Sequence, residues 1–159
     1  MNSHNGDRKY LVTGASGYVG GRLVRALIED KENVRILVRD KNKIMGQPWA
    51  TQVDICEGSA ENFSDLQMAL EGIHTAFYLL HSINLGPNFD EIEREMASNF
   101  AKAAEQAGVS QIIYLGGIAN DVNISKHLAS RAMTGSSLAT TSVAVLELRA
   151  GIIIGSGSA

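Results

Sequence analysis

The chain has 159 residues, of which 45% are hydrophobic and 19% charged, values typical of one globular domain with a buried core. Its net charge of −3, with no lysine or arginine cluster, argues against nucleic acid as the main partner, and its single cysteine, Cys56, excludes an internal disulfide and fits a reducing cytoplasm. Residues 1–9 are too polar for a signal peptide, and no apolar run is long enough to cross a bilayer, so we expect no membrane partner.

The predicted elements alternate between strands and helices along the chain. Residues 1–8 are expected to form a flexible tail and residues 9–159 one domain. The expected strands are 9–13, 33–38, 52–56, 75–80, 111–115 and 142–148. The expected helices are 18–30, a short helix capped by Ser64 and stopped by Gly72, 88–107 and 125–138, with a loop or broken helical turn at 41–50.

This alternation predicts βαβ units and a parallel sheet. The strands at 9–13, 75–80 and 111–115 lack the alternation of a half-exposed sheet, which predicts helices on both of its faces. The outer edge of the sixth strand and one sheet face are expected to stay uncovered, which favours a homo-oligomer.

The turn after the first strand is the most informative feature of the sequence. Gly14, Gly17 and Gly20 lie between an apolar strand and a helical pattern. Gly14 permits a tight, left-handed turn, Gly17 lets the backbone approach a phosphate, and Gly20 lets the helix pack closely. The pattern predicts a site for the diphosphate of a dinucleotide at the helix N-terminus. A glycine-rich loop without a ligand is the alternative.

The end of the second strand bears on the choice of dinucleotide. Arg39 is the first residue past this strand, and Lys41 and Lys43 add positive charge nearby. An arginine here suits the 2′-phosphate of NADP, whereas Asp40 suits the ribose hydroxyl of NAD. This charge pattern favours NADP(H) over NAD(H). The alternative is that Arg39 is an ordinary surface residue.

Several stretches of the sequence carry a family resemblance: Thr13–Gly20, Val34–Asp40, Ala76–Ser82, Ile112–Gly117 and Glu147–Gly155. With these, the chain resembles the atypical and extended short-chain dehydrogenase/reductases, in particular NAD(P)H-binding and NAD-dependent epimerase/dehydratase-like proteins and the nitrogen-metabolite-repressor type. The resemblance covers nearly the whole chain. It implies an α/β fold of three layers. Its central layer would be a Rossmann-type doubly wound parallel sheet with strand order 3-2-1-4-5-6.

The resemblance also implies a set of cofactor-binding residues. The turn would line the diphosphate, Arg39 would meet the adenosine ribose or its phosphate, His81 and its neighbour would face the middle of the cofactor, and Gly116 would lie near the nicotinamide. The alternative for His81 is that it packs or forms hydrogen bonds in a turn and does not contact the cofactor. The full set is Thr13, Gly14, Ser16, Gly17, Tyr18, Val19, Gly20, Arg39, Leu80, His81 and Gly116.

Three departures from the family pattern concern chemistry. The serine or threonine that the family has after the fifth strand is absent, Ser59 replaces an aspartate that reaches the adenine, and the Tyr-x-x-x-Lys pair is missing. His127 and Arg131 occupy the place of that pair and share its i, i+4 spacing. A histidine is a competent general acid or base and an arginine a fixed cation, so both are candidate catalytic residues. An ordinary histidine and a surface arginine near a helix start are the alternative.

Three functions remain open. The first is the cofactor domain of a reductase or epimerase-like enzyme that transfers hydride between NADP(H) and a small carbonyl or sugar-nucleotide-like molecule. The second is a dinucleotide-sensing regulatory protein without turnover, and the third a scaffold that has lost its ligand. No spacing of residues suggests a metal site. From the resemblance we expect the part that binds substrate to lie outside this sequence, as in a fragment, a short protein, or one whose cleft a partner completes.

Overall fold

The computed structural model describes residues 8–80, 88–118, 126–151 and 153–155. Its six strands are parallel and form a single sheet in the order β3-β2-β1-β4-β5-β6. The strands are β1 Lys9–Thr13, β2 Asn33–Val38, β3 Asp54–Glu57, β4 Thr75–Tyr78, β5 Gln111–Gly117 and β6 Ala144–Ala150. This confirms the expected strand order, with the change of winding direction between β1 and β4.

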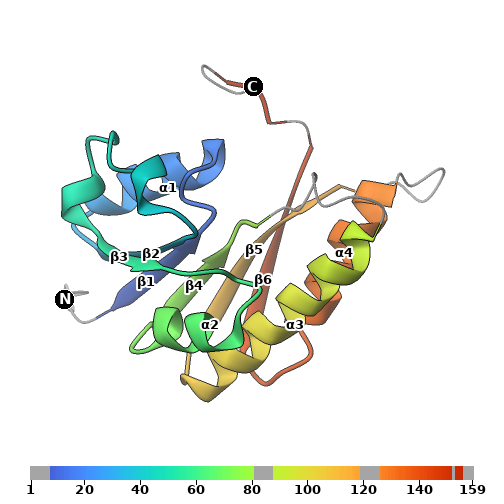
Figure 1. The fold of residues 1–159 in the computed structure, drawn as a ribbon. Helices are drawn as coiled ribbons and strands as arrows, with labels where there is room; N and C mark the ends of the chain where they lie inside the picture. Colours follow the sequence, from blue (N-terminus) through green and yellow to red (C-terminus); the bar gives the residue numbers. More distant parts are fainter. Residues whose placement is uncertain (1–7, 81–87, 119–125, 152, 156–159) are drawn as a thin grey trace, which may run out of the picture.

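Helices lie on both sides of this sheet, which gives the expected three layers (Figure 1). The helix α1 covers one face, and α2, α3 and α4 cover the other. The helices are α1 Tyr18–Glu29, α2 Phe63–Leu70, α3 Phe89–Gln106 and α4 Lys126–Leu138, with short 3-10 turns η1 Lys41–Lys43 and η2 Ala50–Gln52. Among the described residues, no helix is long and apolar enough to span a membrane.

Each face of the sheet has its own apolar core. On the α1 side, Val24 packs with Val12, Ile36 and the side chains of Ile44 and Trp49 from the segment after β2. The core on the other side is larger, and it joins α2, α3 and α4 through residues such as Leu66, Phe100 and Leu138 to β4 and β5. Both cores include fully buried side chains from β1, so packing on both faces holds the strand that leads into the glycine turn.

Several element ends differ from the predicted ones because side chains from distant segments occupy backbone groups there. Strand β4 ends at Tyr78, not at residue 80, since the amide of Leu79 donates to the Thr13 hydroxyl (3.1 Å). Strand β6 begins at residue 144, not 142, because Glu105 accepts from both the amide (2.9 Å) and the hydroxyl (2.7 Å) of Ser142.

The predicted cap of the short helix is wrong by two residues. The side chain of Asn62 caps α2 by accepting from the amide of Ser64 (2.9 Å), so Ser64 lies inside the helix. The strand expected at 52–56 is found at 54–57, since Gln52 closes a 3-10 turn by donating to the Trp49 carbonyl (2.9 Å).

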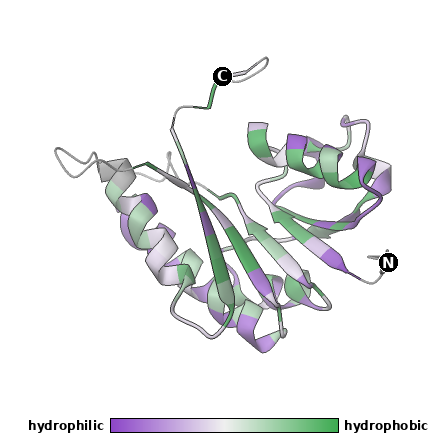
Figure 2. Cartoon of the chain, turned by 180° about the vertical axis from the view of Figure 1, so that it is seen from behind, coloured by the Kyte–Doolittle hydropathy of each residue, from purple (hydrophilic) through white to green (hydrophobic). Residues whose placement is uncertain are grey.

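The expectation that helices cover both faces of the fifth strand is also wrong. Burial alternates along β5 and β6, and one face of these strands has no helix over it in the part of the chain that the structure describes (Figure 2). In β6, Leu146 and Leu148 are 44% and 50% exposed on this face, in register with Ile113 and Leu115 of β5. Strand β6 ends the sheet, so the uncovered edge and face predicted from the sequence lie together here.

Candidate functional site

The glycine turn joins β1 to α1 and is built from backbone alone. Gly14 has a φ of +70°, and a Cβ on it would lie 2.8 Å from the Leu79 carbonyl oxygen. A Cβ on Gly20 would lie 2.2 Å from the carbonyl oxygen of Gly14, so α1 packs directly on the turn. The amide of Gly17 donates to that same carbonyl (2.9 Å). Gly14 and Gly20 thus act as the sequence predicted, although Gly20 packs on the turn, not on a strand.

The first turn of α1 has no side-chain cap. Gly17 is its N-cap residue, no side chain accepts from the first amides, and no acidic residue lies in the first turn. By helix geometry the amides of Tyr18 and Val19 have no acceptor within the helix. By contrast, α2 has its cap in Asn62. The start of α1 therefore offers donors and the positive end of a helix dipole to an anion.

Thr13, the last residue of β1, fixes the start of the glycine turn. Its hydroxyl donates to the Phe77 carbonyl (3.0 Å) and accepts from the Leu79 amide (3.1 Å), and its side chain is fully buried. Thr13 therefore fixes the end of β1 against the end of β4, where the direction of winding changes. Leu80 follows as a half-buried residue at the same edge of the sheet, and His81 lies outside the described residues.

The end of β2 carries the charged side chains that we expect to determine the preference between NADP(H) and NAD(H). Arg39 is exposed and makes no ion pair with any described residue, so its guanidinium is available. The carboxylate of Asp40 caps η1 by accepting from the Asn42 amide (2.9 Å). Lys41 is paired with Glu57 (3.7 Å). Arg39 is therefore the better placed of these charges to meet a ligand.

A hollow of about 320 Å³ lies beside the glycine turn. Ser16, Tyr18, Arg22 and Arg25 contribute to its lining together with Gln47 from the segment after β2. The guanidinium of Arg22 lies 3.8 Å from the centre of the Tyr18 ring. Arg22 and Arg25 make the electrostatic potential around the turn more positive. Neither arginine was predicted as a site residue from the sequence.

The nicotinamide side of the predicted site involves β5, β6 and α4. A Cβ on Gly116 would lie 2.5 Å from a carboxylate oxygen of Glu147, so this glycine makes room for that side chain. The Tyr114 hydroxyl donates to the Arg131 carbonyl (3.0 Å), and burial raises the pKa of Tyr114 to about 12. Tyr114 is thus a structural residue, which holds α4 on β5.

Both candidate catalytic residues belong to α4, so their i, i+4 spacing places them on one side of that helix. Arg131 is half-buried, whereas the side chain of His127 lies outside the described part of the chain. Between them, the buried Ser130 donates its hydroxyl to the carboxylate of Glu93 on α3. Sequence reasoning missed Glu93, since nothing along the chain indicates which residue of α3 faces α4.

Ser59 is tied into the loop after β3. Its amide donates to the carboxylate of Asp65 (2.8 Å), and its hydroxyl accepts from the Glu61 amide (3.2 Å). Ser59 therefore holds its loop, and Asp65 on α2 holds Ser59. The sequence analysis overlooked Asp65, although an acidic residue in the first turn of a short helix is a recognisable signal.

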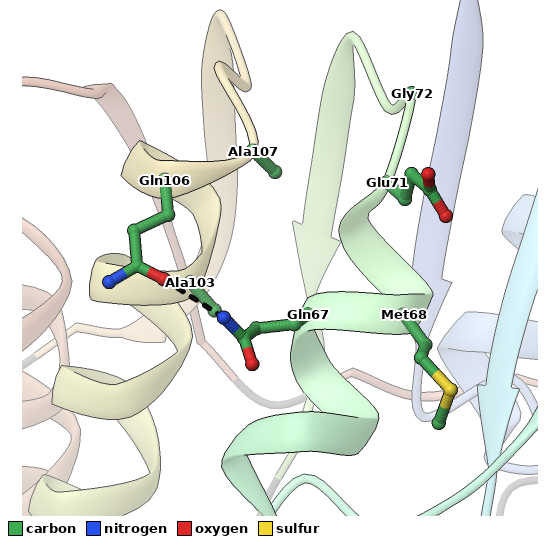
Figure 3. A pocket seen from close by; sticks show the side chains of 7 residues that line it. All are labelled: Gln67, Met68, Glu71, Gly72, Ala103, Gln106 and Ala107. Atoms are coloured by element: carbon green, nitrogen blue, oxygen red, sulfur yellow. Dashed lines mark hydrogen bonds between the residues drawn. The ribbon is translucent and has the colours of Figure 1, made fainter.

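A second hollow, of about 440 Å³, lies between the C-terminal ends of α2 and α3 (Figure 3). Gln67 and Gln106 meet across it, with the amide of Gln67 donating to Gln106 (3.1 Å). These helix ends lead into β4 and β5. The hollow therefore lies near the amino ends of the strands, whereas the glycine turn lies at their carboxyl ends. Within the described ranges, no group of three histidine, cysteine, aspartate or glutamate residues could hold a metal ion.

Comparisons with known proteins agree with this geometry. The model of a family described as NAD(P)H-binding matches residues 14–150. A 3-beta-hydroxysteroid dehydrogenase of Mycolicibacterium neoaurum is 33% identical over 116 residues, which are 67% of this chain and 31% of that protein.

The fold is similar to solved structures of reductases. Triphenylmethane reductase of Citrobacter sp., solved with NADP(H), has a TM-score of 0.75 at 23% identity over 89% of this chain and 48% of that one. A short-chain dehydrogenase/reductase superfamily protein of Agrobacterium tumefaciens with bound NAD has a TM-score of 0.72 at 19% identity, with the same shares covered. The chain thus spans about half the length of these structures and about a third of the curated relative.

Proposed function

Because the chain belongs to the NAD(P)H-binding family, we propose that it binds NADP(H) at the carboxyl ends of its strands and serves hydride transfer to or from a small molecule. The observation that carries this proposal is the first turn of α1, which has a glycine N-cap, no side-chain cap and no acidic residue. Its amides and dipole suit a diphosphate.

The residues around this turn fit such a cofactor. The amides of Tyr18 and Val19 would hold the diphosphate, Ser16 and Gly17 would line it, and Thr13 would keep the turn in place. The close packing at Gly14 and Gly20 keeps the turn tight, and Gly17, which has no side chain, would let the backbone approach the phosphates. When bound, the nicotinamide ring supplies a hydride donor or acceptor.

The preference for NADP(H) over NAD(H) rests on Arg39. This arginine is exposed and unpaired among the described residues, while the neighbouring carboxylate of Asp40 caps η1. A guanidinium binds a phosphate through two parallel hydrogen bonds. The arginines of the hollow beside the turn, Arg22 and Arg25, add to the positive potential there.

For the chemistry we propose His127 as the proton donor or acceptor and Arg131 as a fixed cation that holds the ribose or the substrate. Both residues lie in the N-terminal half of α4, which follows β5 in the chain, and Gly116 is the last residue but one of β5. The substrate class we propose is a small carbonyl compound or a sugar-nucleotide-like molecule. We place this activity in the cytoplasm, since a single cysteine suits a reducing compartment.

A dinucleotide-sensing regulatory protein is the second candidate. The observation in its favour is the end of β5, where Leu115, Gly116 and Gly117 provide no hydroxyl group for catalysis. Such a protein would bind NADP(H) through the same turn and change its partner contacts without turnover. Cofactor oxidation with a panel of aldehydes, ketones and quinones distinguishes the two candidates, because only the enzyme consumes NADPH.

A homo-oligomer is the proposed assembly in either case. The free edge of β6 and the exposed Leu146 and Leu148 form an apolar region on a sheet face that no described helix covers. Exposed apolar surface next to an open strand edge favours association.

Titration calorimetry with NADPH on wild-type protein and on Gly17→Asp tests the proposed site. At the N-cap, an aspartate would accept from the first amides of α1 and raise the melting temperature. The same carboxylate would occupy the diphosphate position, so we expect NADPH affinity to fall at least about tenfold. A stabilised variant that binds no NADPH would locate the site at this turn.

Two controls accompany this test. Gly46→Asp adds the same charge at a position with open space around the Cβ and should keep its NADPH affinity. Gly17→Ala adds a side chain that cannot cap the helix, so it should lower the melting temperature slightly. No heat of binding and no thermal stabilisation of the wild type by NADPH would overturn the proposed function.

A further inference from the structure

Strand β6 carries one charge of each sign close to its outer edge. It is the last strand of the sheet, and no described strand pairs with its outer side (Figure 1). Side chains alternate between the faces of a strand, so Leu146 and Leu148 lie on the uncovered face and Glu147 and Arg149 on the face of α4. The guanidinium of Arg149 donates to the Glu147 carboxylate (3.2 Å). A strand with two opposite charges on one face is able to pair with a reversed copy of itself.

The backbone of β6 determines which residues would bond to a partner strand. The amide of Ile118 donates to the Ala150 carbonyl (3.1 Å), so the backbone groups of Ala150 point toward β5. Backbone groups alternate in direction along a strand, so those of Leu148 also point toward β5, whereas those of Glu147 and Arg149 point outward. The amides and carbonyls that the edge offers to a partner therefore belong to the two charged residues.

The charges select one symmetric register for such a pair. In two antiparallel strands related by a two-fold axis, opposite residues share a face, and the axis passes through one residue of each strand. An axis at Glu147 or at Arg149 would place like charges opposite each other, which is destabilising. Glu147 lies opposite the Arg149 of the second copy only when the axis passes through Leu148.

The register centred on Leu148 also agrees with the backbone. Glu147 and Arg149 of the two copies would exchange hydrogen bonds through their outward amides and carbonyls. The two Leu148 residues would form a pair without such bonds, with their Cα atoms about 4.5 Å apart and their side chains in contact on the uncovered face. Because Arg149 also pairs with Glu147 in its own strand, four charges of alternating sign would surround the axis.

We propose that β6 pairs antiparallel with the β6 of a second copy of the chain, about a two-fold axis at Leu148, so that the two sheets become continuous. This inference rests on the homo-oligomer of the proposed function and gives it a defined interface. The side chain of Arg149 is 66% exposed and long enough to cross to the second copy. The side chain of Glu147, 24% exposed, is held near the edge between Gly116 and Gly135, which leave room for its carboxylate.

Disulfide cross-linking tests the register. In a Cys56→Ser background, Leu148→Cys would place two thiols on the axis at a Cα separation that a disulfide spans. We expect it to form a covalent dimer under mild oxidation, read on a non-reducing gel. Leu146→Cys is the matched control, because the side chain is similarly exposed on the same face, but its Cα would lie about 13 Å from its symmetry mate. Cross-linking through residue 146 and not 148 would reject the register.

A charge reversal tests the proposed ion pairs. Arg149→Glu would place two glutamates opposite each other at both ends of the pair, so we expect the dissociation constant of the dimer to rise at least about tenfold in sedimentation analysis. Arg149→Lys keeps the charge and should keep the dimer. Lys43→Glu reverses an exposed charge beyond the other side of the sheet and should also keep it. Unchanged association in Arg149→Glu would reject the edge pairing and indicate contact through the apolar face alone.

The outcomes separate this inference from the proposals that precede it. A monomeric wild type would reject both the homo-oligomer and the strand pairing, and would leave the edge to another occupant, such as polypeptide outside these residues. A dimer that fails the cross-linking or the charge reversal keeps the homo-oligomer and rejects the pairing. The dinucleotide site is tested independently, because Gly17→Asp lies at the start of α1 and should form the same dimer as the wild type.

Discussion

At the scale of single residues, Arg39 and Asp40 show how neighbouring charges acquire different tasks. The Asp40 carboxylate caps η1, and Lys41 is paired with Glu57, whereas Arg39 has no ion pair among the described residues. A free guanidinium at the end of β2 is what a 2′-phosphate requires. The sequence favoured Arg39 but could not show that Asp40 caps a turn and that Lys41 is paired, because capping and pairing depend on the turn that follows β2.

Arg39→Ala should therefore change the choice of cofactor. We expect NADPH affinity to fall about tenfold or more, since a charge-assisted pair with a phosphate is lost, while NADH affinity stays the same. Titration of the variant with both dinucleotides measures this selectivity. Lys43→Ala is the matched control, because it removes a nearby exposed charge that is not at the strand end. Unchanged NADPH affinity in Arg39→Ala would contradict the assignment.

His127 and Arg131 belong to the same scale. If His127 transfers the proton, His127→Asn should lower kcat about a hundredfold and leave NADPH affinity unchanged, because general acid–base groups act on the chemical step. Ser136→Ala, an exposed change on the same helix, should have no effect. The measurement is NADPH oxidation with the best substrate of the carbonyl panel. Equal turnover in His127→Asn would remove the catalytic role.

At the scale of elements, apolar patterns were enough to predict the six strands, the four helices and their alternation. The ends of the elements were harder to predict, because single polar contacts between distant segments decide them. Thr13 ends β4 by binding Leu79, and Glu105 delays the start of β6 by binding Ser142. In the candidate site, too, local sequence patterns were predictive and contacts between distant segments were not. The glycine spacing predicted the turn, whereas the contribution of Gln47 to the hollow beside it depends on the path of the segment after β2.

Arg35 illustrates how one side chain can stabilise three elements. From β2 its guanidinium donates to the carbonyls of Met68 (3.2 Å), Ala69 (3.1 Å) and Glu71 (2.8 Å), at the C-terminal end of α2. It also pairs with Asp54 of β3 (2.8 Å). The last carbonyls of a helix have no partner within it, and a cation there also complements the helix dipole.

Arg35→Met should lower the free energy of unfolding by about 2 kcal/mol, because three carbonyls at the end of α2, one of them part-buried, and a carboxylate lose a charged donor. Lys9→Met, which removes only the more exposed pair with Asp54, should cost less than about 1 kcal/mol. Urea denaturation at neutral pH measures both values. Equal small losses in the two variants would show that the helix end does not depend on Arg35.

The same cluster predicts how stability changes with pH. Hydrogen bonds from Lys9 and Arg35 lower the pKa of Asp54 below its usual value of 3.8. The stabilisation is therefore present above about pH 4 and is lost as the pH falls through the lowered pKa. Because Asp54 is half exposed, we expect less than about 1 kcal/mol from it. Asp54→Asn should be less stable than wild type at pH 6, and the difference should shrink at pH 3 in urea denaturation.

At the scale of the whole molecule, the two faces of the sheet are covered unequally. Three helices pack on one face, whereas on the other face α1 packs over β1 and β2 and leaves β5 and β6 uncovered by any described helix. The leucines of β6 remain exposed beside the free edge of the sheet. Since β5 and β6 share this face in register, the exposed side chains form a continuous apolar surface, and not isolated exposed residues.

This surface carries the last prediction, that the chain associates with itself. Burying one leucine side chain contributes about 1.5–3 kcal/mol, and a symmetric contact would bury Leu146 and Leu148 from both copies. Analytical ultracentrifugation at micromolar concentration should therefore show a dimer or a larger species. Leu146→Lys/Leu148→Lys should shift it to the monomer without lowering the melting temperature, because these side chains contribute little to either core. Met68→Lys, at an exposed methionine on α2, should leave the oligomer intact. A wild-type protein with the mass of a monomer would contradict the self-association and would leave the proposed dinucleotide site at the start of α1 untouched.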